Sequence, residues 1–304
     1  MVNDMASKIK SEIILVTPEM ATKYLCFNEQ NRRVRPGWVN YLAYVIRNGE
    51  WKATHQGIAF SESGRLLDGQ HRLMAIVKAD ISVNMLVTYG LDDQTFSAID
   101  NGIKRTDEDL TGICKPTIEI IKFLVFVTGF EGIECASKNE RTSKITPTQI
   151  NFYNNQVGFL CEFLQKEAPT RSKVFGSTPV RTAAIVAMML GESPDYVITT
   201  YRQLTLGDTQ SMSPICHSAV RQVLTGRITT KGGEEVRIEN FVRFLPVFKK
   251  ANQHTLKLIR RDCATVLQEI RKPLKPWFSN QKESRLNPKI EQVRSEIYKH
   301  LSAA

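Results

Sequence analysis

The sequence lacks the features that mark several protein classes. Its six cysteines form no CxxC pair and its five histidines show no metal-ligand spacing, so we expect neither a disulfide framework nor a zinc site. No apolar run reaches the roughly 18 residues that span a bilayer. Residues 1–12 place charges where a signal peptide has its apolar core. We therefore expect a reduced cytoplasmic protein without a membrane partner.

The net charge of +10 is carried by one end of the chain. Residues 1–220 contain 23 Lys and Arg against 23 Asp and Glu, whereas residues 221–304 contain 18 against 8. Aromatic residues lie between the basic ones in this second region, namely Phe244, Phe248, Trp277 and Phe278. That mixture is typical of surfaces that neutralise phosphates and stack on bases. The residues expected to bind nucleic acid, as DNA, are Lys249, Lys250, Lys257, Arg260, Arg261, Arg271, Lys272 and Lys275. The alternative is the solvated face of amphipathic helices.

Hydrophobic periodicity predicts an α+β chain with a small α/β domain over residues 1–112 and a helical domain over residues 113–304. Strands are expected at 13–16, 57–60, 65–67 and 83–89, with helices between them after Thr17, around Trp38 to Ile46 and from Gln70 to Val77. The expected apolar stripe of the second of these helices is Trp38, Leu42, Val45 and Ile46, which lie at helical spacing. Only helices are expected afterwards, at 118–128, 148–166, 179–190, 214–224, 239–250, 254–271 and 288–301, separated by loops that include 131–143 and 225–234. The basic part, residues 221–304, closes the second domain.

The strongest chemical signal is Leu66-Leu67-Asp68-Gly69-Gln70-His71-Arg72. A buried strand ends at Asp68, Gly69 allows a sharp turn, and the following helix directs its unpaired N–H groups at the same place. Such a helix start attracts phosphate, and Arg72 adds a cation for bidentate contact. Asp68 is then placed to hold a divalent ion or to orient a hydroxyl, and His71 to transfer a proton. In the alternative interpretation, Asp68 caps the helix and His71 is a partly buried spacer.

Gly69-Gln70-His71-Arg72, between a strand and a helix, resembles the signature turn of the ParB/sulfiredoxin superfamily, in which this turn binds nucleoside triphosphate. The stretch that also includes Asn31-Arg32 and Asp100-Asn101-Gly102 is similar to phage-type ParB-like proteins with a DGQHR motif, over roughly residues 12–112. Gln70 stands where sulfiredoxins have their reactive cysteine, which excludes sulfinic acid reduction. No helix-turn-helix pattern follows, unlike in chromosome-partitioning ParB proteins.

The resemblance implies a set of nucleotide-binding residues. An arginine-bearing box upstream of the turn faces the nucleotide in ParB relatives, and the chain has Asn31 and Arg32 at that place. A second basic turn follows at Arg105 and Thr106, although Thr106 is equally placed to cap a short helix. The expected phosphate or nucleotide contacts are therefore Asn31, Arg32, Gly69, Gln70, Arg72, Arg105 and Thr106, with ATP or CTP and Mg²⁺ as cofactors and Asp68 as the metal contact.

These observations lead to a leading hypothesis and two alternatives. The leading hypothesis is a nucleotide-binding ParB-like NTPase or phosphotransferase that acts on or beside nucleic acid in a bacteriophage or mobile element. One alternative is a non-catalytic DNA-binding or host-takeover factor that uses the fold as a scaffold. The other is a Mg²⁺-dependent nuclease, and a homo-oligomer is left open. The hypothesis requires a corner at Gly69 that is not plugged by side chains, with Arg72 free to reach an oxyanion.

Overall fold

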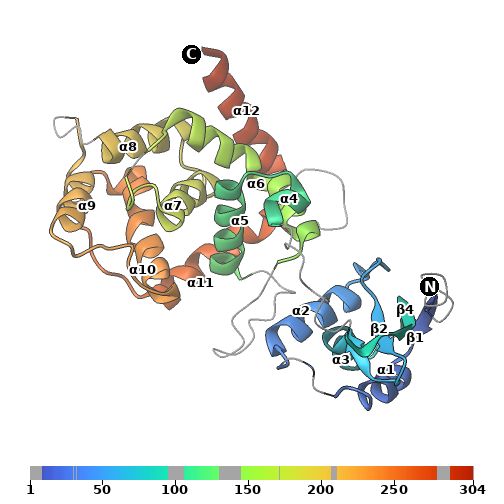
Figure 1. The fold of residues 1–304 in the computed structure, drawn as a ribbon. Helices are drawn as coiled ribbons and strands as arrows, with labels where there is room; N and C mark the ends of the chain where they lie inside the picture. The colour runs from blue at the N-terminus through green and yellow to red at the C-terminus, as the bar shows by residue number, and fades with distance from the viewer. Residues whose placement is uncertain are drawn as a thin grey trace. The chain divides into compact units, whose positions relative to one another are not determined.

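The computed structural model describes residues 9–29, 31, 33–94, 106–129, 145–170, 172–206, 211–278 and 288–303. These residues divide into two compact units (Figure 1). The first contains residues 9–94 and 145–146, and the second contains 106–129 and 147–303. The first unit is mixed α/β and the second is helical, so the α+β class expected from the sequence is confirmed. None of the helices in these ranges combines the length and apolar character needed to cross a bilayer.

The first unit is built around a four-stranded sheet with the order β1-β4-β2-β3. Strand β1 pairs with β4 in antiparallel orientation, β2 pairs with β4 in parallel, and β3 is antiparallel to β2. The elements of this unit are β1 (Lys10–Val16), α1 (Pro18–Leu25), α2 (Pro36–Arg47), β2 (Ile58–Ser61), β3 (Leu66–Asp68), α3 (Gln70–Ala79) and β4 (Val83–Leu91). All four strands were expected from the sequence, with small shifts of their ends.

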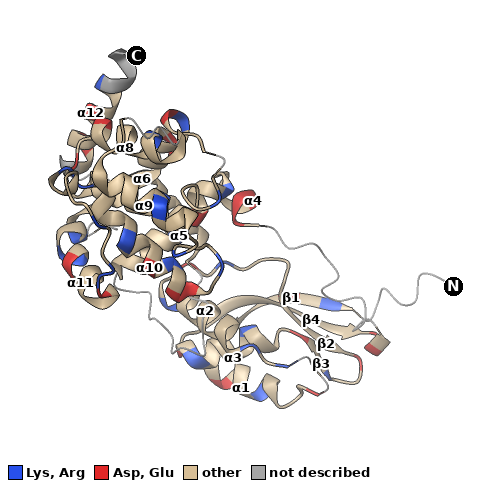
Figure 2. Ribbon diagram, turned by 90° about the vertical axis from the view of Figure 1, so that its left-hand side faces the viewer, with Lys and Arg blue, Asp and Glu red and all other residues tan. Residues whose placement is uncertain are grey.

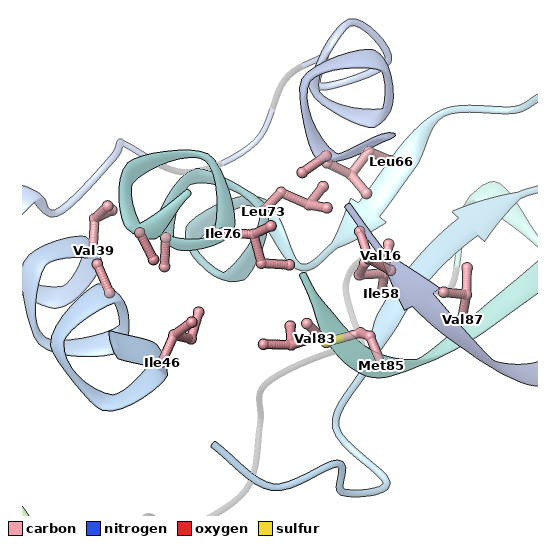
Figure 3. Packing of buried hydrophobic residues seen from close by; sticks show 14 of the residues in the cluster. Val16, Val39, Ile46, Ile58, Leu66, Leu73, Ile76, Val83, Met85 and Val87 are labelled. Carbon is pink, nitrogen blue, oxygen red and sulfur yellow. The ribbon is translucent and has the colours of Figure 1, made fainter. Parts of the chain in front are cut away.

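One hydrophobic core joins the sheet to the three helices (Figure 3). Alternate residues of β4, Val83, Met85 and Val87, are buried in this core, as expected for a strand with one covered face. Leu73 and Ile76 of α3 are fully buried against them. Because α3 contacts the sheet along this face, its first turn is held at the end of β3.

Helix α2 forms where the sequence predicts, but a different face of it is buried. Its fully buried residues are Val39, Ala43 and Ile46. Trp38, which the periodicity assigned to the core stripe, is 37% exposed. Helix α2 packs on α3, and Val39, Ala43 and Ile46 are its members of the core that the helices share with the sheet.

The second unit consists of helices packed around buried apolar residues. Its elements are α4 (Asp107–Thr111), α5 (Lys115–Thr128), α6 (Pro147–Glu167), α7 (Thr178–Met189), α8 (Pro194–Leu206), α9 (Pro214–Leu224), α10 (Glu234–Phe244), α11 (Cys263–Leu274) and α12 (Pro288–Ala303), with short 3₁₀ turns η2 (Leu245–Phe248), η3 (Lys250–Asn252) and η4 (Lys275–Trp277). The expected loop 131–143 lies outside the described residues.

Three expectations for the second unit are wrong. Helix α8 was not predicted, although Ser193-Pro194 is the same start signal that marks α7 and α9. The helix expected at 239–250 ends at Phe244, because Pro246 has no N–H to continue the α-helical ladder and the chain tightens to 3₁₀.

The helix expected at 254–271 begins only at Cys263. Asp262 caps it, with its carboxylate accepting the N–H of Thr265 at 2.8 Å. The preceding segment is not helical and is held by α9: Ser218 accepts the Leu258 N–H, and Gln222 donates to the Leu258 carbonyl. These tertiary hydrogen bonds satisfy backbone groups that a helix would otherwise satisfy.

Candidate functional site

The turn between β3 and α3 has the geometry that the sequence predicts. Gly69 is the N-cap of α3 and has a φ of 107°, in the left-handed region that favours glycine. A Cβ at this position would lie 3.1 Å from Ile58 Cγ1, which is tighter than ordinary van der Waals contact. Glycine is therefore required both for the backbone conformation and for the close approach to β2.

The loop before α2 lies against this turn through three hydrogen bonds. Asn31 Nδ2 donates to the Leu66 carbonyl at 2.7 Å. The backbone N–H of Arg35 donates to His71 Nε2 at 3.0 Å, and Asn28 Nδ2 donates to the Gln70 side chain at 3.4 Å. The structure thus brings the upstream box and the glycine turn together. The Asn31 amide is used to fasten the loop to β3, however, and Asn31 does not line the pocket described below.

Asp68 and Arg72 form an ion pair across the turn. Arg72 Nη1 lies 3.1 Å from Asp68 Oδ2 and also donates to the Gly57 carbonyl at 2.8 Å. Asp68 Oδ1 accepts the Gly69 N–H at 2.6 Å. The alternative interpretation, in which Asp68 caps the helix, is wrong: the N-cap is Gly69, no side chain caps this helix start, and the N–H that Asp68 accepts belongs to Gly69 itself. Among the described residues, neither Nη2 nor Nε of Arg72 has a hydrogen-bond partner.

The corner is not plugged, because a pocket of about 270 Å³ opens beside it. Helix α2, the segment before β2 and the β3–α3 turn supply its walls. The lining residues are Trp38, Tyr41, Leu42, Val45, Trp51, Lys52, Thr54, Gln56, Asp68, Gly69, His71 and Arg72. The sequence hypothesis required an open corner and a free Arg72. The first requirement is met, whereas the second is not, because the guanidinium of Arg72 is paired with Asp68.

The pocket is lined by both aromatic and charged side chains. The rings of Trp38 and Tyr41 are stacked, with centroids 5.0 Å apart and an angle of 21° between their planes. Trp51 is fixed by a hydrogen bond from its Nε1 to the Asn84 carbonyl. The charged lining residues are Lys52, Arg72 and Asp68, which are two cations and one carboxylate. A flat ring and an anion are the two chemical groups that this lining complements.

His71, the second predicted catalytic residue, and its neighbour Gln70 both have hydrogen-bond partners in the structure. His71 is 4% exposed, and its Nε2 accepts the N–H of Arg35. That nitrogen therefore has a hydrogen-bond partner. His71 has the buried environment of the alternative interpretation, in which it is a spacer. Gln70 is also buried, with its side chain directed to Asn28. Of the turn residues, Asp68, Gly69, His71 and Arg72 line the pocket, whereas Gln70 does not.

Three residues of the predicted phosphate set are not placed beside the turn. Arg32 and Arg105 lie outside the described residues. Thr106 belongs to the second unit and is the N-cap of α4. Its hydroxyl and the carboxylate of Asp109 form a reciprocal capping box. The helix-capping interpretation of Thr106 is therefore the one that its contacts support.

The prediction that the aromatic residues of the basic region stack on bases is wrong. All four residues are buried in the core of the second unit: Phe244, Phe248, Trp277 and Phe278 are at most 4% exposed. Trp277 donates to the Met189 carbonyl at 3.2 Å and is not available to stack on a base. Phe244 ends α10, Phe248 and Trp277 lie in the 3₁₀ turns η2 and η4, and Phe278 follows η4, so the rings are buried where the chain leaves a helix while nearby lysines stay exposed.

The basic half of the predicted nucleic-acid surface is partly paired. Arg260 contacts Glu239, Arg261 lies 2.9 Å from Glu269, and Arg271 Nε donates to the Val127 carbonyl. Lys250, Lys257, Lys272 and Lys275 are exposed, and Lys249 is half-buried. Lys and Arg of α11 are blue in Figure 2. The exposed lysines are the members of the predicted set that keep their charge at the surface.

Sequence reasoning missed much of the pocket wall, namely Tyr41, Trp51 and Lys52, and it also missed Gly57, which lies outside the lining but holds Arg72. Gly57 has a clear structural role, since a Cβ there would lie 1.8 Å from the Leu86 carbonyl oxygen. Its carbonyl then anchors Arg72. The spacing of Trp38 and Tyr41 on one helix was a visible signal, because residues three apart lie side by side.

Comparisons of the chain with models of protein families, with curated proteins and with solved structures found no match. Within the described residues, no three His, Cys, Asp or Glu side chains gather as metal ligands. The likeness to the ParB/sulfiredoxin superfamily therefore stays a prediction from the sequence. The proposals below are based on the geometry of the pocket.

Proposed function

We propose that the pocket of the first unit binds a nucleotide. The observation that carries this proposal is the combination, in one pocket, of the stacked rings of Trp38 and Tyr41 with the Gly69 turn and Arg72. A nucleobase is a flat ring that packs against aromatic side chains, and a phosphate is the anion that guanidinium groups bind in bidentate fashion. Few other common metabolites have both groups.

The size of the pocket limits how much of the ligand it encloses. Its volume of about 270 Å³ is at the lower end of the range for small-molecule sites. We therefore expect the pocket to hold one part of a nucleoside triphosphate, with the remainder in solvent.

The expected chemistry is that of an NTPase or phosphotransferase acting on or beside nucleic acid. Phosphoryl transfer needs mainly positioning and charge neutralisation, which Arg72 and Lys52 would supply. When bound, Mg²⁺ would neutralise phosphate charge, and it is commonly held by one or two carboxylates together with phosphate oxygens. Asp68 and a triphosphate offer that donor set jointly. Asp68 would orient the bound species, and Arg72 would hold it.

Calorimetric titration with ATP, CTP and GTP in the presence of Mg²⁺ tests the proposal. The wild-type chain should bind at least one of them, and Arg72→Ala should weaken that affinity by about tenfold to a hundredfold, since a hydrogen bond to a charged group contributes about 1.5–3 kcal/mol. Arg47→Ala is the matched control, because Arg47 also donates to a backbone carbonyl, that of Lys78, but does not line the pocket. Absence of wild-type binding at millimolar nucleotide would refute nucleotide binding, and absence of phosphate release would refute the NTPase activity.

A second candidate function is DNA binding by the exposed lysines of the C-terminal region. It is favoured by Lys250, Lys257, Lys272 and Lys275, which keep their charge at the surface. Without exposed aromatic residues at these positions, we expect binding through phosphates alone and therefore without sequence preference. This binding is compatible with nucleotide binding in the other unit, or with the role of a non-catalytic factor.

Salt dependence separates these lysines from a general effect of net charge. Replacing Lys272 and Lys275 by Gln should weaken DNA binding and reduce the slope of log affinity against log salt by about one unit for each lost phosphate contact. The control is Lys10 and Lys23 replaced by Gln, which removes the same charge from the first unit. Equal effects of the two double variants would contradict the assignment.

A further inference from the structure

The pocket already contains, beside Arg72, an anion that belongs to the chain. Both oxygens of the Asp68 carboxylate are engaged: Oδ1 accepts the Gly69 N–H at 2.6 Å, and Oδ2 lies 3.1 Å from Arg72 Nη1. These two donors are the ones that a phosphate at the turn would use. The carboxylate therefore takes the position of a ligand anion.

The surroundings make this competition effective. The side chain of Asp68 is 24% exposed and that of Arg72 is 18% exposed, so water screens the pair only in part. An incoming phosphate would meet the carboxylate within a few ångströms, where like charges repel strongly. A metal-free phosphate would have to displace Asp68 from its two donors and remain beside it.

Arg72 has a second anchor that does not depend on Asp68. Its Nη1 also donates to the carbonyl of Gly57, at 2.8 Å. Gly57 is held against β4 so closely that a side chain there would overlap the Leu86 carbonyl. The guanidinium would therefore stay in place if the carboxylate acquired another partner.

We propose that Asp68 is an internal anion that guards the phosphate position, so that the pocket accepts a phosphate ligand together with a divalent cation and rejects the metal-free anion. This inference rests on the proposed nucleotide function. A divalent cation removes the repulsion because it is a partner for both negative groups. With Asp68 paired in that way, the Gly69 N–H and Arg72 are available to the phosphate. Asp68 thus determines the metal requirement and selects the ligand by its charge.

Calorimetric titrations with ATP, CTP and GTP, each with excess Mg²⁺ and with EDTA, test this inference. We expect wild-type affinity to be at least about tenfold weaker in EDTA. Asp68→Asn keeps an oxygen for the Gly69 N–H but removes the negative charge. Its affinity for the metal-free nucleotide should be at least about tenfold higher than that of the wild type. Glu12→Gln is the matched control, since it removes one negative charge from β1, away from the pocket, and should behave as the wild type.

The outcomes distinguish failure of this inference from failure of the proposed function. If the wild type binds nucleotide equally well with and without Mg²⁺, or if folded Asp68→Asn gains no metal-free affinity, the inference is wrong while nucleotide binding stands. If neither protein binds nucleotide under any condition, both proposals are wrong. Thermal unfolding establishes whether Asp68→Asn is folded, and if it is not, the two wild-type titrations decide alone.

Discussion

The two units place their aromatic residues differently with respect to basic ones. In the first unit, Trp38 and Tyr41 line a pocket that also contains Arg72. In the second unit, Phe244 and Trp277 are buried in the helical core, and the neighbouring basic residues face solvent. An aromatic and basic mixture in a helical sequence therefore indicates amphipathicity first. It indicates a ligand surface only where a loop or a second element brings the two kinds of side chain to the same side.

The largest effect that tests this comparison is expected for Trp277→Ala. The substitution leaves a cavity in the core and removes the donor to the Met189 carbonyl, so the free energy of unfolding should fall by about 3–5 kcal/mol. Urea denaturation followed by circular dichroism measures the change. Unchanged stability together with weaker DNA binding would instead place Trp277 on a nucleic-acid surface.

The second effect is a pH dependence in the core of the second unit. Burial raises the pKa of Tyr201 to about 12, and its hydroxyl donates to the Phe175 carbonyl at 2.6 Å. The unfolded chain loses this proton near pH 10, whereas the folded chain keeps it, so stability is fully present below pH 10 and falls as the pH rises towards 12.

Thermal unfolding of the wild type and of Tyr201→Phe between pH 8 and pH 11 tests this expectation. The variant should be about 1–3 kcal/mol less stable at pH 8, because the Phe175 carbonyl loses its donor. It should then lose less stability than the wild type above pH 10. Parallel curves for the two proteins would show that Tyr201 does not titrate as its burial implies.

A third effect tests the tight turn of the first unit. Gly69→Ala should cost about 1–3 kcal/mol, because alanine is strained at a φ of 107° and its Cβ would press on Ile58. Gly64→Ala is the matched control: Gly64 also has a positive φ, of 88°, but open space around it. The difference between the two free energies of unfolding isolates the packing contribution, and equal values would show that β2 gives way easily.

The smallest effect on stability is expected for Trp38→Ala. Since Trp38 is 37% exposed, we expect a loss below about 1 kcal/mol, in contrast to Trp277→Ala. Nucleotide affinity should nevertheless fall about tenfold, and Trp38→Phe should restore most of it, because stacking of a base contributes about 1–3 kcal/mol. Titration calorimetry and thermal unfolding of both variants measure the two quantities. A large loss of stability without loss of affinity would make Trp38 a core residue.

Local structure at the candidate site was predictable to within about a residue. The strand before Asp68, the glycine turn and the helix start at Gln70 follow from short-range preferences, and so do the caps at Thr17 and Thr106. The pairing of Asp68 with Arg72 is also local, since a spacing of four residues brings the two side chains together.

Features that depend on tertiary contacts were not predictable. The helix expected from residue 254 is replaced by an irregular segment because side chains of α9 hydrogen-bond to Leu258. The pocket wall depends on which face of α2 packs against α3, and periodicity alone assigned Trp38 to the wrong side. Both errors arise where another element competes with the local preference of the chain.

The amino-acid sequence by itself determined the α+β class, the position of the Gly69 turn and the concentration of positive charge after residue 220. These depend on composition, on periodicity and on backbone preferences that act over a few neighbouring residues. Only the tertiary structure decided that Trp38 and Tyr41 line the same pocket as Asp68 and Arg72, and that the aromatic residues of the basic region are buried. The reason is that burial and pocket formation depend on which surfaces meet, and these surfaces come from segments far apart in the chain.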